Sequence, residues 1–431
     1  MPSLGELLER ESATVDLDPG HFERMLRRRD RRSRNQRIRA GALAVLVAIV
    51  TVAALARAFN GADRTADDTH PPTFKGAILT VAGDLLARDP GTGEARTLVD
   101  ANSIDSKFRD SLINWAASSA DGRWVAFEVQ ACGSRPGPAT IGGLWVTNGV
   151  DEPRQLTKPC LEDPDISLDD GFWEWSPTGA QLVVAVGSAD GDALALIDPA
   201  DGDRTDLGDA AGDITSLAWS PDGTRIAYGA VPAGTRNAES PIAGSVYSVE
   251  AGGGDHSLLA SQVGDVSGGE TGSGIRWSPD GSRIAVLAQA EENTLYLMNA
   301  DGSDLHLVTE GVVIEHTLGS PGLVWSPDGT RIAYATFTGD RERLQIWNGS
   351  PDGSAPILVF ESPPIPGARL SLSGNPVWSP DGDRLAFRYS LTYDERLVLV
   401  ANADGTGSAR EIDMLTYLAW RGGWYFCECY G

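Results

Sequence analysis

Catalytic motifs are absent from this sequence. Along its 431 residues there is no G-x-S-x-G turn, which presents the nucleophilic serine of many hydrolases, and no H-E-x-x-H pair, which binds zinc. Histidine is scarce, with five residues: His21, His70, His256, His306 and His316. These absences disfavour a Ser-His-Asp hydrolase and a histidine-ligated metal. We therefore expect a protein that is not an enzyme, with no catalytic residues, no metal and no cofactor.

Cysteine is as rare as histidine. The four residues are Cys132, Cys160, Cys427 and Cys429. Cys132 and Cys160 fall within one structural repeat, near the ends of two strands expected to run the same way, so they are a candidate disulfide. The three pairings of four cysteines nevertheless stay open from the sequence, and a zinc site of four thiolates is the alternative.

Basic residues are sparse in most of the chain. The net charge is −25, but residues 1–39 carry ten Arg against seven acids, and residues 60–431 carry −29. Binding to nucleic acid needs clustered Lys and Arg. The acidic body therefore excludes DNA and RNA as partners.

Only one long apolar run stands out. Ala40–Ala56 reads AGALAVLVAIVTVAALA, and eight Arg precede it between positions 27 and 39. Because positive residues stay in the cytoplasm, this pattern predicts a single transmembrane helix over 40–58 in the cell membrane, with the N-terminus inside and the rest of the chain outside. A cleaved signal peptide ending near Ala56 is the alternative.

The segments beside this run are polar. Residues 1–39 are predicted to form an Arg-rich helical segment in the cytoplasm, and residues 59–75 a linker with a Pro pair. The Arg side chains are expected to contact lipid headgroups, and a cytoplasmic regulator is a second candidate partner.

Repetition is what the sequence has in abundance. The ten residues WSPDGTRIAY occur at Trp219–Tyr228 and again at Trp325–Tyr334. Counting copies that have drifted, the motif gives seven tryptophans spaced 42 to 60 residues apart: Trp115, Trp175, Trp219, Trp277, Trp325, Trp378 and Trp420. This period is typical of a fold built from repeated supersecondary units.

The motif has the chemistry of a turn between two strands. Ser, Pro and Gly fit a type I β-turn, and the alternating TRIAYGA fits a half-buried strand. A second hairpin, with a turn such as Asn299-Ala300-Asp301-Gly302, follows each first one. The repeated Asp-Gly pairs are therefore interpreted as turn residues and not as metal ligands: Asp222, Gly223, Asp280, Gly281, Asp328, Gly329, Asp381 and Gly382.

The order of the hairpins predicts a closed ring. Residues 76–431 begin with a second hairpin and end with a first hairpin, so pairing of 76–99 with 415–430 would complete the last four-stranded sheet. Closure removes the free sheet edges of a linear array. The fold class predicted is therefore all-β, a seven-bladed β-propeller after the transmembrane helix, with six blades as the alternative.

WSPDG…IA followed by NADG resembles the WD40-like repeat of TolB-type β-propellers, which also occurs in the propellers of prolyl oligopeptidases and dipeptidyl peptidases. The resemblance covers 76–431 and implies a propeller, a fold that hosts many activities. TolB-like propellers usually have six blades beside a separate α/β domain, for which this chain has no room. Segment 1–39 is similar to those of actinobacterial membrane proteins with extracytoplasmic sensor domains.

Loops of varied length are expected opposite the SPDG and NADG turns, and such loops on a rigid scaffold usually hold the binding site. The candidate binding face contains Asp163, Asp165, Asp169, Asp170, Arg236, Glu315, His316 and Arg341. The stretch 163–171 is also the best candidate for a cation loop, although it lacks the spacing of a calcium site.

These patterns favour a non-enzymatic, single-pass membrane protein whose extracytoplasmic propeller binds a protein, peptide or glycan. It would serve as a sensor or scaffold that signals to the cytoplasmic tail. The alternative is a hydrolase or lyase acting at the central channel, for which a cluster of Asp, Glu, His or Tyr at the channel mouth would be expected. A structural envelope protein is a third hypothesis.

Overall fold

The chain divides into two units, Met1–His70 and Pro71–Gly431. The computed structural model describes residues 74, 78–82, 84–88, 94–100, 111–131, 142–157, 172–187, 191–235, 244–266, 274–289, 293–315, 320–321, 323–338, 342–364, 371–372, 376–392, 395–412 and 425–426. The predicted cytoplasmic segment 1–39 and transmembrane helix 40–58 lie outside these ranges, as does the linker 59–75 apart from Phe74. No helix among the described residues is long and apolar enough to cross a membrane.

The described elements are β-strands, arranged in successive antiparallel sheets. The first sheet contains β1 (Ile78–Ala82), β2 (Asp84–Arg88) and β3 (Ala95–Val99). The second contains β4 (Ser111–Ser118), β5 (Val125–Ala131), β6 (Gly142–Thr147) and β7 (Arg154–Gln155). The third contains β8 (Trp173–Trp175), β9 (Leu182–Val186), β10 (Ala193–Ile197) and β11 (Arg204–Asp209).

The same order continues along the chain. The fourth sheet contains β12 (Asp213–Trp219), β13 (Arg225–Val231), β14 (Ser245–Glu250) and β15 (Ser257–Ala260). The fifth contains β16 (Ile275–Trp277), β17 (Arg283–Ala288), β18 (Thr294–Asn299) and β19 (His306–Glu310). The small pair β20 (Ile314–Glu315) and β21 (Ser320–Pro321) comes next.

Two further sheets complete the series. The sixth contains β22 (Leu323–Trp325), β23 (Ile332–Phe337), β24 (Leu344–Gly349) and β25 (Ile357–Glu361). The seventh contains β26 (Ser371–Leu372), β27 (Val377–Trp378), β28 (Arg384–Thr392), β29 (Glu395–Asn402) and β30 (Arg410–Glu411). The predicted all-β class with repeated four-stranded sheets is confirmed.

The SPDG turns join the first two strands of a sheet, as predicted. In the fourth sheet Gly223 N–H donates to the Ser220 carbonyl at 2.9 Å, and Ser220 N–H donates to the Arg225 carbonyl at 2.8 Å. Gly223 has φ +71, which a residue with a side chain rarely adopts. The turn residues therefore fix the hairpin locally, before any packing between sheets.

The motif tryptophans join each sheet to the one before it. The indole N–H of Trp277 donates to the Ala218 carbonyl at 3.1 Å, and that of Trp325 donates to the Arg276 carbonyl at 3.2 Å. Trp175, Trp219 and Trp378 make the equivalent bond to Ala117, Glu174 and Val324. All five tryptophans are buried, and each lies in a hydrophobic cluster shared by two successive sheets.

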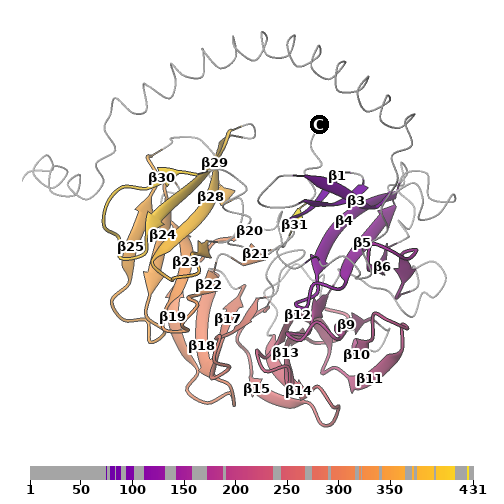
Figure 1. The fold of residues 1–431 in the computed structure, drawn as a ribbon. Coiled ribbons are helices and arrows are strands. Elements are labelled where there is room, and N and C mark those ends of the chain that lie inside the picture. The colour runs from indigo at the N-terminus through magenta and orange to yellow at the C-terminus, as the bar shows by residue number, and fades with distance from the viewer. Residues whose placement is uncertain are drawn as a thin grey trace, which may run out of the picture. The chain divides into compact units, whose positions relative to one another are not determined.

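The first strands consequently lie next to one another from sheet to sheet. β12 contacts both β8 and β16, and β22 contacts β27. Figure 1 shows the outermost strands, such as β11, β15 and β25, on the outside of the series of sheets, with β12 and β22 further in. The first strand of each sheet therefore supplies the side chains on the inner side of this unit.

One repeat assignment from the sequence is wrong in its register. A motif tryptophan pairs with the third residue after the turn glycine, as Trp219 pairs with Ile226 after Gly223. In the second sheet this place belongs to Ser118, which pairs with Val125 after Gly122. Trp115 lies three residues earlier and pairs with Glu128. The turn itself is confirmed, since Ser119 and Asp121 make the usual motif hydrogen bond at 2.6 Å.

The two ends of the folded part differ from the single hairpin predicted for each of them. Residues 78–99 form three strands rather than two, because β1 and β2 make an additional tight hairpin. In the C-terminal segment the structure describes β31 (Tyr425–Phe426), which pairs with β4 and contacts β1. Trp420 and most of 415–430 lie outside the described residues, so closure of the ring by pairing of 76–99 with 415–430 stays a prediction.

Candidate functional site

The candidate binding face from the sequence lies almost wholly outside the described residues. This is true of Asp163, Asp165, Asp169, Asp170, Arg236, His316 and Arg341, and also of Cys132 and Cys160. Glu315 is placed only as a residue of β20, whose backbone pairs with Ser320 of β21. The structure therefore does not test whether these residues meet, and both the binding face and the disulfide stay predictions.

The motif aspartates serve their own turns. Asp222 Oδ1 accepts hydrogen bonds from the hydroxyl of Ser220 at 2.6 Å and from the backbone N–H of Thr224 at 3.0 Å. The bond from Ser220 and those from Thr224 hold the pKa of Asp222 at about 2, because they favour the charged form. Asp280, Asp328 and Asp381 make the same set of bonds.

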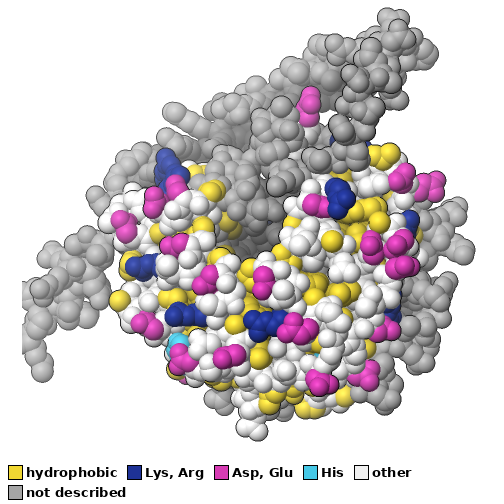
Figure 2. Space-filling model, turned by 60° about the horizontal axis from the view of Figure 1, so that its bottom comes forward, with side chains coloured by type: hydrophobic (Ala, Val, Ile, Leu, Met, Phe, Trp, Pro, Cys, Tyr) yellow, Lys and Arg dark blue, Asp and Glu magenta, His cyan; other side chains and the backbone are white. Residues whose placement is uncertain are grey.

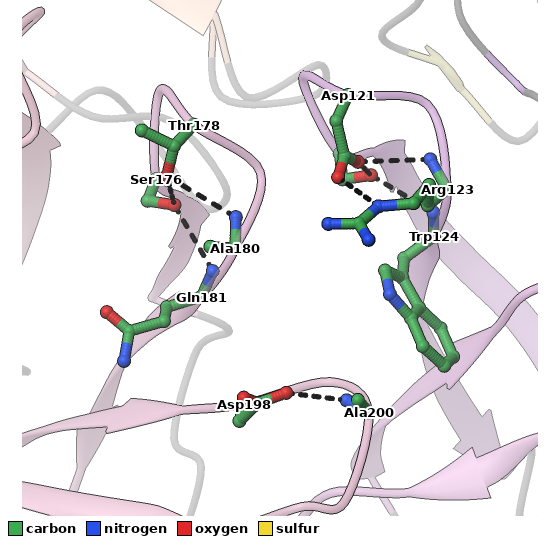
Figure 3. Close-up of polar contacts among 10 residues, drawn as sticks. Asp121, Arg123, Trp124, Ser176, Thr178, Ala180, Gln181, Asp198 and Ala200 are labelled. Carbon is green, nitrogen blue, oxygen red and sulfur yellow. Dashed lines mark hydrogen bonds and ion pairs between the residues drawn. The ribbon is translucent and has the colours of Figure 1, made fainter.

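Two neighbouring turns show what changes when the aspartate is replaced by threonine. Figure 3 shows Asp121 receiving bonds from its own turn, beside a turn where Thr178 replaces the aspartate. There Ala180 N–H reaches Thr178 Oγ1 at 3.4 Å, a weaker contact than the 3.0 Å bond from Arg123 N–H to Asp121. The turns hold their polar groups internally and offer little chemistry to a ligand. Among the described residues there is also no group of three His, Cys, Asp or Glu able to hold a metal.

The two described histidines both bond groups of the protein itself. Nδ1 of His256 lies 2.6 Å from the hydroxyl of the buried Tyr228, and its Nε2 lies 3.1 Å from the Leu207 carbonyl. It therefore links the third and fourth sheets. His306 is half-buried at the start of β19, with its Nε2 3.2 Å from the Pro351 carbonyl.

The residues just before the motif tryptophans form the most varied set on the first strands. We call these the pre-tryptophan positions, and we include Ala117, which precedes Ser118 at the equivalent place in the second sheet. The carbonyls of the first five accept the indole bonds described above: Ala117, Glu174, Ala218, Arg276, Val324 and Val377. Four of them carry small or aliphatic side chains. Glu174 and Arg276 are the two charged members, with opposite signs, on the strands to either side of β12.

Glu174 belongs to β8 but its side chain reaches β12. Its Oε2 accepts the backbone N–H of Trp219 at 2.8 Å. Loss of solvent raises the pKa of this carboxyl to about 7, while the positive charge of Arg276 and the Trp219 bond act against that rise. The group therefore changes charge close to neutral pH, unlike the motif aspartates.

Arg276 belongs to β16 and is half-buried. Its guanidinium donates to the Ile275 carbonyl at 2.9 Å, and its charge is felt by Glu174. Another carboxylate joins the second and third sheets, since Oε1 of Glu128 on β5 accepts the indole N–H of Trp173 on β8 at 2.5 Å. Glu174 was not found from the sequence, although aligning the residues before each tryptophan would have shown it and Arg276.

The surface around the sheets is mixed in charge. Figure 2 shows acidic and basic side chains interspersed over the described surface. Large hydrophobic side chains exposed among the described residues are Val150, Leu258, Leu305 and Leu307.

Comparison with known proteins supports the fold but not a narrower family. No family model matches the chain, and no curated protein does. A solved structure of an oligogalacturonate lyase in complex with manganese is similar at a TM-score of 0.51 and 14% identity, over 79% of this chain and 88% of that one. TolB from Acinetobacter baumannii is similar at 0.39 and 17% identity, over 70% and 65% of the two chains. A putative TolB from Agrobacterium tumefaciens is similar at 0.36 and 20%, over 60% and 83%.

The likeness to the lyase, at this identity, is a likeness of fold. Together with the repeated four-stranded sheets it places the chain among the β-propellers. The all-β organisation and the SPDG hairpins agree with the TolB-like propeller that the sequence predicted.

Proposed function

We propose that this chain is a non-enzymatic binding protein of the cell membrane. Its extracytoplasmic propeller would bind a protein, peptide or glycan and serve as a sensor or scaffold for an Arg-rich cytoplasmic tail. The membrane part of the proposal depends on the uncharged run Ala40–Ala56 and the Arg residues before it. Lipid headgroups and a cytoplasmic regulator are the proposed partners of that tail.

The number of blades belongs to the same proposal. Seven sheets of three or more strands follow one another in the described residues, apart from the small β20–β21 pair. We therefore favour seven blades over six, with segment 415–430 closing the ring.

The observation that supports binding outside the turns is the self-contained chemistry of the turns. In six described motif turns the aspartate or its threonine replacement is engaged by its own serine and by the backbone two residues on: Asp121, Thr178, Asp222, Asp280, Asp328 and Asp381. A surface whose polar groups are already satisfied has little to gain from a polar partner. We therefore assign the protein, peptide or glycan site to the irregular loops at the other end of the sheets.

Protease treatment of intact cells tests the topology. Digestion of the propeller in intact cells, with residues 1–39 protected until lysis, is expected. Protection of both parts until lysis would contradict an extracytoplasmic propeller.

Cross-linking in intact cells then tests binding. Photoreactive residues placed at Asp169 and Arg236 of the loop face should capture a partner, whereas the matched positions Thr224 and Thr330 in the turns should not. Equal capture at both sets would show that the loop face has no special role.

An enzyme acting at the central channel is the second candidate. The observation in its favour is Glu174, whose pKa of about 7 suits a general acid or base. The oligogalacturonate lyase of similar fold makes oligogalacturonate the first substrate to try. Turnover that Glu174→Gln abolishes would favour the enzyme over the binding protein.

A further inference from the structure

The sixth sheet carries a row of linked polar side chains towards its loop end, where β23 and β25 end and β24 begins. The indole N–H of Trp347 donates to the Thr336 hydroxyl at 2.9 Å, and this hydroxyl donates to Oε1 of Gln345 at 3.3 Å. Nε2 of Gln345 donates to one carboxylate oxygen of Glu361 at 2.7 Å, and the Arg343 guanidinium donates to the other at 2.7 Å. We call these five residues the sheet-six network.

The repeat does not require this network. Thr336 pairs with Gln345 two residues beyond the pair of Tyr334 with Trp347. At the equivalent place, the second to fifth sheets and the seventh each pair at least one residue that has no polar side chain: Val129 with Gly143, Val186 with Ala193, Ala230 with Ser245, Ala288 with Thr294, and Tyr389 with Leu397. The polar pair is therefore a property of the sixth sheet and not of the repeated unit.

Solvent reaches the network, but its backbone is held in place. The side chain of Arg343 is 40% exposed and that of Glu361 is 22% exposed, and the other three residues are half-buried. Trp347 also packs against the hydrophobic cluster shared by the fifth and sixth sheets. The buried Ser362 ties β25 to β24, because its hydroxyl accepts the N–H of Leu344 at 3.0 Å. Groups fixed in advance lose little entropy when they bind a ligand.

The network keeps hydrogen-bonding capacity for a ligand. In the described part of the chain, the Arg343 guanidinium uses one of its five N–H donors, and the Gln345 amide uses one of its two. Each carboxylate oxygen of Glu361 accepts one bond and can accept another. The row crosses the neighbouring strands β23, β24 and β25, so it extends for about 10 Å.

We propose that the sheet-six network binds the hydroxyl groups of a neutral glycan of two or more rings, which rests on the proposed function and specifies its ligand. Neighbouring hydroxyls of a sugar ring both donate and accept hydrogen bonds. The Glu361 carboxylate accepts from them, while the Arg343 and Gln345 N–H groups donate to them. The exposed part of the Trp347 ring supplies an apolar surface for the C–H groups of the sugar.

Charge and geometry favour a sugar over other ligands. Arg343 and Glu361 already neutralise each other, so a charged ligand would compete with an existing ion pair at 2.7 Å. A peptide would satisfy its own backbone best along an edge strand such as β25, and it would make less use of side chains spread over three strands. A neutral sugar depends on such side chains for all its hydrogen bonds.

Calorimetric titration of the full-length chain tests the site. The neutral probes are maltose, cellobiose, lactose, trehalose and chitobiose. Digalacturonate serves as the charged sugar for comparison, and trialanine as the peptide. At least one neutral disaccharide should bind, and it should bind more tightly than digalacturonate and trialanine.

Two variants connect binding to the network. Gln345→Leu removes the amide bonds at similar volume, and Glu361→Gln removes the charged acceptor. Each should weaken binding of the best disaccharide roughly tenfold, the loss expected for a hydrogen bond to a charged group. The matched control is Glu310→Gln, which should leave the affinity unchanged. Glu310 ends the fourth strand of the fifth sheet, at the place that Glu361 holds in the sixth.

The outcomes separate clearly. Binding of no neutral disaccharide, or binding that neither substitution weakens, overturns the proposal. Tighter binding of digalacturonate or of trialanine also overturns it. Cross-linking at Asp169 and Arg236 can still capture a partner after such a result, so failure of the sugar site differs from failure of the proposed function. If Gln345→Leu does not fold, then Glu361→Gln and the probes on the unaltered chain still decide the question.

Discussion

The motif turns and the pre-tryptophan positions lie within a few residues of each other but obey different rules. The turns repeat Ser, Asp and Gly, with the same hydrogen bonds, from sheet to sheet. The pre-tryptophan positions share a backbone geometry but vary from Ala to Glu and Arg. The repeated residues thus build the sheets, whereas the variable ones are free to carry properties of this particular chain.

The largest expected effect comes from a repeated residue. Trp277→Ala should lower the free energy of unfolding by about 3–5 kcal/mol, because a buried aromatic side chain is replaced by a cavity. It also loses the bond to Ala218 and the contact with Arg225, whose guanidinium lies 4.9 Å from the ring centre. Urea unfolding measures the change. The control Leu258→Ala, at a side chain 55% exposed, should stay within about 0.5 kcal/mol.

Two turn glycines allow the cost of backbone strain to be measured separately from the cost of a steric clash. Gly302 and Gly253 have similar φ values of +85 and +82. A Cβ on Gly302 would lie 2.5 Å from the Leu259 carbonyl oxygen of the preceding sheet, whereas one on Gly253 would meet nothing within 4 Å. Gly253→Ala should cost about 1 kcal/mol from strain alone, and Gly302→Ala about 1–3 kcal/mol more. Equal losses of stability for the two variants in thermal unfolding would show that the neighbouring sheet shifts to accommodate the Cβ without cost.

Removing the charge of Glu174 should stabilise the fold, whereas removing a motif side chain should destabilise it. Since the pKa of Glu174 is raised from 4.5 to about 7, the folded state binds more protons than the unfolded state in that window, and stability falls as pH rises through it. Glu174→Gln should therefore be more stable than the unaltered chain by about 1–3 kcal/mol at pH 8 and equal to it below pH 4.5. A variant less stable at pH 8 would mean that the charge itself supports the fold.

The smallest effect is expected at the one described motif turn with threonine. Thr178→Asp should stabilise the chain by about 0.5–1 kcal/mol, because it restores the strong acceptor that Asp222 provides in the next sheet. The reverse change, Asp280→Thr, should cost a similar amount. If neither change alters the urea midpoint, the aspartate bonds contribute nothing measurable.

Much of the fold could be predicted because its signals are local. The turn at Ser220–Gly223 is fixed by Pro, Asp and Gly within four residues, and the alternation after it fixes the strand. The register of Ser118 could not be predicted in this way, because the sequence offers a tryptophan three residues earlier, at Trp115. Pairing of Phe426 with Trp115 is a contact between distant parts of the chain.

The candidate site was harder to predict for a related reason. Glu174 stands between two tryptophans in the sequence WEW and looks like an ordinary solvent-facing strand residue. Its shielding and its bond to Trp219 come from the neighbouring sheet, which the local pattern does not contain. The contact between His256 and the Leu207 carbonyl escaped prediction in the same way, because it depends on how the third and fourth sheets pack.

The indole bonds give the series of sheets a direction. Each of the five tryptophans from Trp175 to Trp378 donates backwards, to a carbonyl of the sheet made earlier in the chain. A ribosome releases the N-terminal sheets first, so every new sheet would find its acceptor already in place when its own tryptophan emerges. The chain is thus suited to assembly one sheet at a time during synthesis, in the order in which it is translated.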